Sequence, residues 1–344
     1  MPSFDSITHT SEMKPAPEAP PPPTYIFREH KDTVNYVHLF DQDQHLASCD
    51  ADGWIVIWKM KTRRVVLKWK AHEDSCLKVT TMTAATTTTA AREKHTLISQ
   101  GRDNQIHIWK LHIDDENQDT LLESSIVYNA LGFCKFSLDE KHDESTLLCF
   151  PSRDDIAMFD IYDLTYQCYV LQNIGQTDSG THRLGSCMAV ELFRTSDGLF
   201  VLAAYESGST ALWEIKQSKA ILIWQTKEHQ EPVLDLSIDP FRTFAISSSA
   251  DNQICKYSLA TGDVINKITI KKSGAVALRI RPDNKIFALG GYDGRIRLFS
   301  VKSMKPLAVL SYHKDTVYSV DFSQSDNWMV CASQDHRISL WSIF

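Results

Sequence analysis

Residues 335–341 read Asp-His-Arg-Ile-Ser-Leu-Trp. This unit places an aromatic residue six positions after an Asp, with an isoleucine three positions before the aromatic residue. Four further copies keep all three residues, at positions 52–58, 103–109, 251–257 and 293–299. Two degenerate copies end at Phe159 and Trp213, where Arg153 and Ser207 take the place of the Asp. An internal repeat therefore organises the chain, and it decides the fold class.

The seven copies set a period. Their aromatic residues, at positions 58, 109, 159, 213, 257, 299 and 341, lie about 47 residues apart on average, close to the length of a four-stranded propeller blade. Short β-branched and aromatic runs fill the intervals, punctuated by Asp, Gly and Asn, and helical periodicity does not take over. The sequence predicts an all-β fold, a seven-bladed β-propeller.

Histidines precede four of the copies. His30, His72, His229 and His313 come 22, 31, 22 and 22 residues before the turn Asp, and the longest interval contains a threonine-rich stretch at residues 80–91. These residues resemble the WD-repeat signature, in which a loop histidine, a serine, the turn Asp and the Trp share hydrogen bonds. The resemblance assigns this structural set: His30, Ser48, Asp52, Trp58, His72, Ser99, Asp103, Trp109, His229, Ser247, Asp251, His313, Asp335 and Trp341.

A polar set of this kind satisfies the buried donors and acceptors of a loop that folds back onto a sheet. In the seventh repeat Cys331 stands at the serine position, so we expect the set to be incomplete there. Ser, His and Asp are also the residues of a hydrolase triad. Catalysis needs one activated copy in a cleft, however, and recurrence at fixed spacing indicates a structural role.

The two ends of the chain predict how the ring closes. The chain stops three residues after Trp341, which leaves the seventh blade with three strands and an open edge. Residues 25–28 occupy the position of an outer strand before His30, but no earlier blade precedes them to which they could belong. We therefore expect this N-terminal strand to complete the last blade. Seven of the twelve prolines lie in residues 1–23, so we expect a disordered Pro-rich arm at 1–23 and the propeller at 24–344.

Composition and motifs argue against several functions. The 36 Lys and Arg residues against 43 Asp and Glu residues give a net charge of −7 and a pI near 6.0, which disfavours direct nucleic-acid binding. No run of 18 apolar residues is present, so we expect no membrane segment. Phosphate-binding loops, zinc-protease helices and nucleophile elbows are all missing from the sequence. We predict a non-enzymatic protein with no catalytic residues, no cofactor and no metal.

One face of the predicted disc is a candidate partner surface. The residue two positions after each marker histidine is acidic, and such loops share a face with the residues just before the turn Asp. A ring of carboxylates round a concave mouth favours a basic peptide, whereas the plain alternative is turn chemistry, since Asp accepts local backbone hydrogens. The candidate face comprises Asp32, Asp74, Arg102, Glu231, Tyr292 and Asp315.

Longer stretches carry a narrower resemblance. Several resemble the ASTRA-associated WD-repeat family of fungi: residues 50–54 with Trp58 and 62–64, residues 101–104 with Trp109, and residues 132–134. Others are similar to its animal counterpart, the guanine-nucleotide-binding-protein β-subunit-like protein: residues 280–283, 304–310 and 334–341. The resemblance covers about residues 22–343, and blades three and four carry it least.

The resemblance implies a non-enzymatic adaptor subunit of a mainly nuclear assembly. Such assemblies contain the Tel/Tti cochaperone, RuvB-like AAA+ ATPases and a large kinase-related cofactor. They are associated with chromatin regulation and with maturation of phosphatidylinositol-kinase-related kinases. We expect the nucleus as the main location and the cytoplasm as a second one.

Two alternatives remain open. A G-protein β-like signalling scaffold would keep the fold, but those proteins usually bring an N-terminal coiled coil, and the Pro-rich arm has no heptads. A propeller enzyme or metal-dependent hydrolase would need convergent carboxylates or histidines in the central channel, and the sequence shows no such constellation.

Overall fold

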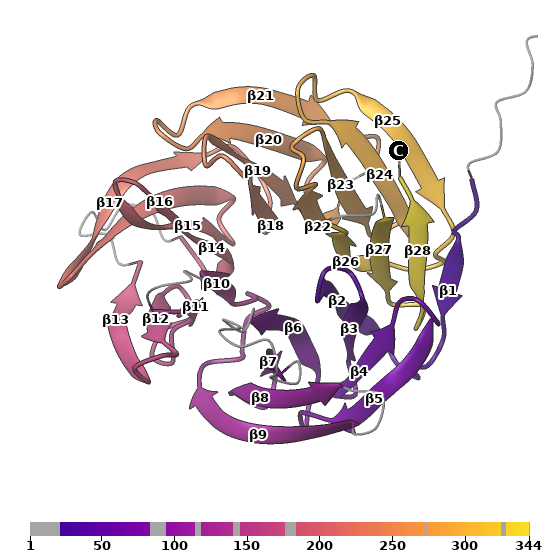
Figure 1. The fold of residues 1–344 in the computed structure, drawn as a ribbon. Helices are drawn as coiled ribbons and strands as arrows, with labels where there is room; N and C mark the ends of the chain where they lie inside the picture. The colour runs from indigo at the N-terminus through magenta and orange to yellow at the C-terminus, as the bar shows by residue number, and fades with distance from the viewer. Residues whose placement is uncertain are drawn as a thin grey trace, which may run out of the picture.

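The computed structural model describes residues 21–82, 94–113, 118–139, 145–175, 184–272, 274–324 and 328–343. In this part of the chain the regular elements are 28 β-strands, which form seven antiparallel four-stranded sheets. The sheets stand as blades around a central axis and form a closed ring (Figure 1). The predicted seven-bladed propeller is confirmed. None of these residues forms a helix long and apolar enough to cross a membrane.

Blades one to six each use four consecutive strands, and the first strand of each lies innermost (Figure 1). Blades one to three comprise β2 (Val34–Phe40), β3 (His45–Asp50), β4 (Trp54–Lys59), β5 (Arg64–Lys70), β6 (Cys76–Met82), β7 (Lys94–Gly101), β8 (Gln105–Ile113), β9 (Gln118–Val127), β10 (Ser137–Asp139), β11 (Leu147–Pro151), β12 (Phe159–Asp163) and β13 (Cys168–Ile174). Blades four to six comprise β14 (Cys187–Thr195), β15 (Gly198–Tyr205), β16 (Ser209–Lys216), β17 (Lys219–Lys227), β18 (Val233–Ile238), β19 (Phe244–Ser249), β20 (Gln253–Ser258), β21 (Val264–Thr269), β22 (Ala275–Ile280), β23 (Ile286–Gly291), β24 (Arg295–Ser300) and β25 (Pro306–Ser311).

Blade seven joins the two ends of the chain. Its strands are β26 (Val317–Phe322), β27 (Trp328–Ser333), β28 (Ile338–Ser342) and, outermost, β1 (Tyr25–Phe27). β1 runs antiparallel to β28, and the Thr24 amide donates to the Leu340 carbonyl at 2.7 Å. The predicted closure by an N-terminal strand is confirmed, with a strand one residue shorter than expected. Residues 1–20 lie outside the described residues, so the Pro-rich arm stays a prediction.

The hydrophobic core lies between the blades. Each cluster of buried side chains combines residues of two neighbouring sheets, as where Val34 and Trp58 of blade one pack with Val330 and Leu340 of blade seven. The aromatic residues that end the repeats are all buried, with exposed fractions of 8% or less. Because the middle strands of each sheet are buried on both faces, they read as near-continuous apolar runs, and one ring-shaped core results.

Two irregularities recur from blade to blade. A register shift between the first two strands separates Val34 from Tyr36, Cys76 from Lys78 and Val317 from Ser319, with counterparts in three other blades. A bulge gives a strand extra twist and re-aims its side chains. A second shift accompanies the repeat aromatic residue, as between Ile57 and Trp58. The tight turn of blade one needs Gly53 at a φ of 79°, because a Cβ there would meet the His72 carbonyl oxygen at 2.2 Å.

Candidate interaction face and central channel

One face of the ring is formed by the loops before each first strand and the turns after each second strand; we call it the loop face. Backbone hydrogen bonds tie the two together in the same way in successive blades. The amides of Ala51, Arg102 and Gln334 donate to the carbonyls of Thr33, Ser75 and Thr316 at 2.8–2.9 Å. The fold thus places the marker histidines, the turn Asp residues and the predicted partner residues on a single face.

The histidine sets of blades two and five lie as the repeat predicts. His72 Nδ1 donates to the Asp103 carboxylate at 3.0 Å, and its Nε2 lies 2.8 Å from the Ser99 hydroxyl, which also accepts the Trp109 indole N–H at 2.9 Å. His229 repeats this arrangement with Asp251 and Ser247, and the Tyr257 hydroxyl, 2.7 Å from Ser247 Oγ, takes the place of the indole. Since a carboxylate only accepts, Nδ1 carries the proton and Nε2 accepts from the serine.

Blade one departs from the prediction. His30 Nδ1 donates to Asp50 at 2.7 Å, not to the predicted Asp52, while His30 Nε2 and the Trp58 indole both reach Ser48 as expected. Asp52 is exposed and gives the set only its backbone amide, which donates to Asp50 Oδ1 at 3.1 Å. In blade two the corresponding position is a glycine, where a Cβ would lie 2.2 Å from His72 Nδ1, so there the carboxylate must come from the turn.

Blade seven completes its set from a different strand. His313 Nδ1 donates to Asp335 at 3.0 Å, and His313 Nε2 lies 2.7 Å from the hydroxyl of Ser339. The Trp341 indole N–H donates to the same hydroxyl at 2.8 Å. The expectation of an incomplete set, based on Cys331, is therefore wrong. Position 339 in β28 adjoins position 331 in β27 across the sheet, so a serine on either strand reaches the histidine.

Blade six has no histidine and uses an arginine. Lys271 stands 22 residues before the turn Asp293, where blades one, five and seven have His. The Asp293 carboxylate instead accepts both terminal nitrogens of Arg297, at 3.0 and 2.6 Å. This bidentate pair lowers the pKa of Asp293, because it stabilises the charged form. The turn keeps its shape with a different donor.

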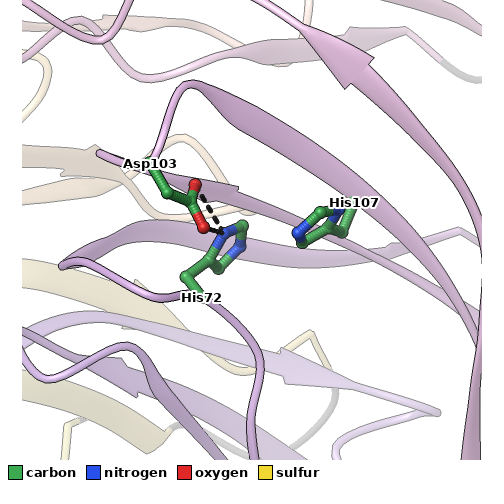
Figure 2. A group of neighbouring side chains, drawn as sticks. All are labelled: His72, Asp103 and His107. Atoms are coloured by element: carbon green, nitrogen blue, oxygen red, sulfur yellow. Dashed lines mark hydrogen bonds and ion pairs between the residues drawn. The ribbon is translucent and has the colours of Figure 1, made fainter.

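Among the described residues, the group of side chains that most resembles a metal site lies in blade two and comprises His72, Asp103 and His107 (Figure 2). Their ligand-type atoms lie within 4.8 Å of one another. The two imidazole rings are stacked, however, with centroids 4.6 Å apart and planes inclined by 16°. Ring nitrogens coordinate in the plane of the ring, so two parallel rings cannot direct their lone pairs at one ion. Both nitrogens of His72 are moreover engaged with Asp103 and Ser99. The group is a stacked hydrogen-bonded cluster.

The acidic residues of the predicted partner face serve partly as turn residues. Asp32 and Asp74 each accept the backbone amide of the following residue at 2.6 Å, which is the turn chemistry considered as the alternative. Glu231 and Asp315 are exposed, and their backbone carbonyls accept serine hydroxyls of the neighbouring turn. Turn use and binding are compatible, since Asp74, Glu231 and Asp315 all remain exposed.

The other two predicted partner residues lie on different parts of the loop face. Arg102 is half-buried, and its guanidinium lies 5.0 Å above the ring of Phe133. Tyr292 is 49% exposed and borders an open groove of about 520 Å³ with Lys271 and Lys272. The structure therefore does not gather all six predicted residues into one site.

The central channel carries charges that the sequence analysis did not find. Lys78, Glu191, Asp235 and Arg279 lie on four different innermost strands and line the channel with Lys135. Burial lowers the pKa of Lys78 to about 8, and burial raises the pKa of Glu191 and Asp235. The signal in the sequence was a charged residue inside an otherwise apolar first strand of the blade.

These channel charges serve the ring itself. The Asp235 carboxylate accepts the amide of Leu278 in the next blade at 2.8 Å, and Lys78 Nζ donates to the Phe136 carbonyl at 2.7 Å. The channel cavity has a volume of only about 50 Å³, room for a few water molecules. The arrangement caps the open edges of the innermost strands.

Most of the ring also matches a known protein family in sequence. A sequence profile described as ASTRA-associated protein 1 matches residues 23–302, most of the ring. The chain belongs to the ASTRA-associated protein 1 family. A second profile, described as WD domain, G-beta repeat, matches residues 304–342, which contain blade seven's three C-terminal strands.

Relatives of this ASTRA-associated family member come from fungi and an animal. An ASTRA-associated protein 1 of Penicillium rubens is 32% identical, over 90% of this chain and 83% of the relative. A guanine nucleotide-binding protein subunit beta-like protein 1 of Mus musculus is 31% identical, over 94% of this chain and 97% of the relative. An ASTRA-associated protein 1 of Schizosaccharomyces pombe is 28% identical, over 94% and 99%. The family resemblance inferred from short stretches is confirmed.

Proposed function

We propose that this chain is a non-enzymatic adaptor subunit of an ASTRA-like assembly and that it holds partner proteins on its loop face. The observation that carries the proposal is the match of residues 23–302 to the profile described as ASTRA-associated protein 1. A ring whose channel, as lined by the described residues, holds a cavity of only about 50 Å³ supports a binding role through its exposed loops.

The proposed partners are the Tel/Tti cochaperone, the RuvB-like AAA+ ATPases and the large kinase-related cofactor. The proposed processes are chromatin regulation and maturation of phosphatidylinositol-kinase-related kinases. The nucleus is the proposed main location, with the cytoplasm as a second. A net charge of −7 and the exposed carboxylates of the loop face support contacts with protein surfaces of opposite charge, without direct contact to nucleic acid.

The absence of catalysis is part of the proposal. Each marker histidine pairs with a carboxylate and a serine, as a triad would, but its serine oxygen is buried against an indole or a phenol in the sheet. Ser48, Ser99, Ser247 and Ser339 are all fully buried, so no substrate carbonyl can approach them. These sets support the fold, and that is the role we propose for them.

Affinity purification of the tagged chain from its own cells, with identification of the co-purifying subunits, tests the proposal. Recovery of the RuvB-like ATPases with the kinase-related cofactor supports it. Their absence from a purification in which the tagged chain is folded and abundant contradicts it. Purification of the same tagged chain after mixing with cells that lack the tag identifies partners acquired only after lysis.

The printed name of the mouse relative favours a second candidate, a G-protein β-like signalling scaffold. A signalling β-type subunit would bind a small γ-type subunit through a coiled coil. The same purification separates the two candidates, because a small stoichiometric subunit without RuvB-like ATPases supports the scaffold alone.

A further inference from the structure

The loop that enters blade three differs in character from the loops of its neighbours. Residues 130–133, Ala-Leu-Gly-Phe, directly precede Cys134. In blades one, two, five and seven the corresponding loop has a histidine with an acidic residue two positions after it. The position of Phe133 is held by Thr33 in blade one and Ser75 in blade two. Leu131 is 73% exposed and Phe133 is 61% exposed. Two large apolar side chains thus stand in solvent where blades one, two and seven present polar ones, Lys31 and Thr33, Glu73 and Ser75, and Lys314 and Thr316.

A third exposed apolar residue, Ile156, is connected to this loop through the backbone of Cys187. The carbonyl of Ile156, in the turn of blade three, accepts the amide of Cys187 at 2.8 Å. The carbonyl oxygen of Cys187 in turn lies 3.9 Å from the Cβ position at Gly132. On the other side Arg102 lies over the Phe133 ring. We call Arg102, Leu131, Phe133 and Ile156 the blade-three patch.

Hydrogen bonds to the turn of blade two hold the loop that carries the patch. The Tyr128 hydroxyl donates to the carbonyl of Gly101 at 2.8 Å, and the Ala130 amide donates to the Asn104 side chain at 3.1 Å. The Leu131 amide donates to the Asn129 side chain at 3.0 Å. Because hydrogen bonds hold the backbone of this loop, less backbone entropy is lost when a partner binds.

Carboxylates flank the patch on two sides. Glu73 and Asp74 lie on the loop whose Ser75 carbonyl accepts the Arg102 amide, and both are exposed. Asp154 and Asp155 directly precede Ile156 and are also exposed. These four carboxylates outnumber the three cations nearby, Arg102, Arg153 and Lys135. The surroundings of the patch are therefore net negative and attract basic side chains.

We propose that the blade-three patch binds a protein segment that places an aromatic or aliphatic anchor residue beside Lys or Arg. The anchor packs on Leu131, Phe133 and Ile156, and the cations face the flanking carboxylates. Exposed apolar side chains rimmed by charge are typical of protein interfaces, in which a few buried anchors supply most of the affinity. Only the identity of the cellular protein that supplies the segment rests on the proposed adaptor role.

Selection from a displayed library of random 12-residue peptides on the immobilised full-length chain provides the test. The most enriched peptide is then labelled with fluorescein, and its affinity is measured by fluorescence anisotropy for the wild type and for Leu131→Ser and Phe133→Ser variants. Phe241→Ser is the matched control, because Phe241 is 74% exposed and lies in the loop between β18 and β19, at the end of the blade opposite the loop face. Thermal melting verifies that all four proteins are folded.

The expected result is enrichment of an aromatic or leucine residue next to Lys or Arg. The selected peptide should bind Leu131→Ser and Phe133→Ser at least about tenfold more weakly than wild type and bind Phe241→Ser unchanged. Raising the salt concentration should weaken binding to the wild type, because exposed charges are screened.

Three results would overturn the proposal: no enriched peptide, enrichment of acidic peptides, or equal affinity for wild type and Phe133→Ser. Dimerisation of the wild type that Phe133→Ser abolishes would also overturn it, because a second copy of the chain would then occupy the patch. The library contains no cellular subunit, so these outcomes do not depend on whether the chain joins an ASTRA-like assembly.

Discussion

At the scale of single residues, the same polar network is built from different side chains in different blades. The carboxylate comes from Asp50 in blade one and from Asp103 in blade two, and the hydroxyl comes from Ser339 in blade seven. What the fold requires is an acceptor for the histidine Nδ1 and a hydroxyl between Nε2 and the indole. Any strand position that reaches these points fills the role.

The correction in blade one gives a direct prediction. Asp50 is buried and accepts His30 Nδ1 and the amides of Asp52 and Trp54, so Asp50→Ala leaves buried donors unpaired. We expect a loss of about 2–4 kcal/mol in the free energy of unfolding. Asp52→Ala removes an exposed side chain and should change it by less than about 0.5 kcal/mol. Urea denaturation followed by tryptophan fluorescence measures both, and a larger effect at position 52 would contradict the assignment.

The stacked histidines of blade two predict a pH dependence. Burial and the neighbouring His72 lower the pKa of His107 from 6.5 to about 4. Between these values the unfolded chain binds a proton that the folded chain does not, so stability falls as the pH drops from about 6.5 to about 4. His107→Gln removes this group, and its free energy of unfolding should fall less over the same range. Parallel urea titrations at several pH values check this; identical slopes for both proteins would refute it.

The residues of the repeat were predictable to the extent that spacing determines them. An Asp at position 50 and an Asp at position 52 both fit a repeat of this length, and only the three-dimensional path shows which one meets His30. Cys331 and Ser339 are neighbours across two strands, and a linear pattern carries no information about that pairing. Leu131 and Phe133 have the apolar character of strand residues, so their exposure in a loop could be found only from the structure.

At the scale of elements, the innermost strands form one closed set because each blade caps the next. Each innermost strand has one edge without a neighbouring strand. This free edge faces the channel, where backbone amides would otherwise be unpaired. Side chains of the neighbouring blade accept these amides: Asp321 accepts Leu39, Ser237 accepts Ile280 and Ser137 accepts Leu192. Polar residues in these strands therefore stabilise the junctions between blades.

Asp321 tests this role at the junction of blades seven and one. Burial alone would raise the pKa of its carboxyl, but the His38 hydrogen bond and the Arg279 charge lower it instead. Asp321→Ala leaves the Leu39 amide and Arg279 without their acceptor, and we expect a loss of about 3–5 kcal/mol in unfolding free energy. Asp321→Asn keeps an acceptor for the amide and should lose less. Equal losses for the two variants, measured by urea denaturation, would show that the hydrogen bond to Leu39 contributes little.

At the scale of the whole molecule, a seven-bladed disc closed by its own two ends was predictable from the repeat count and the position of residues 25–28. The surfaces were less predictable, because they depend on which loops meet in space. The sequence predicted Arg102 as a residue of the partner face, but it did not predict the contact of Arg102 with Phe133 or the charged channel. The channel charges sit in the interior strands at positions that vary between blades, so no fixed spacing marks them.

The central structural claim is that the N-terminal strand fastens the ring. Phe27 is buried, and its ring lies 5.0 Å from that of Trp58 in blade one, so β1 contributes to the junction of the first and last blades as well as covering β28. Truncation of this buried side chain to alanine is expected to cost about 3–5 kcal/mol. A chain that lacks β1 exposes both the β28 edge and this part of the core.

The most direct measurement compares the melting temperatures of two truncated chains, one without residues 1–20 and one without residues 1–28. We expect the chain without residues 1–20 to have the melting temperature of the full-length protein. The chain without residues 1–28 should melt at least about 5 °C lower. If the shorter chain aggregates, Phe27→Ala in the full-length chain gives the same comparison against wild type. Equal melting temperatures for the two truncated chains, or for Phe27→Ala and wild type, would contradict closure of the ring by its N-terminal strand.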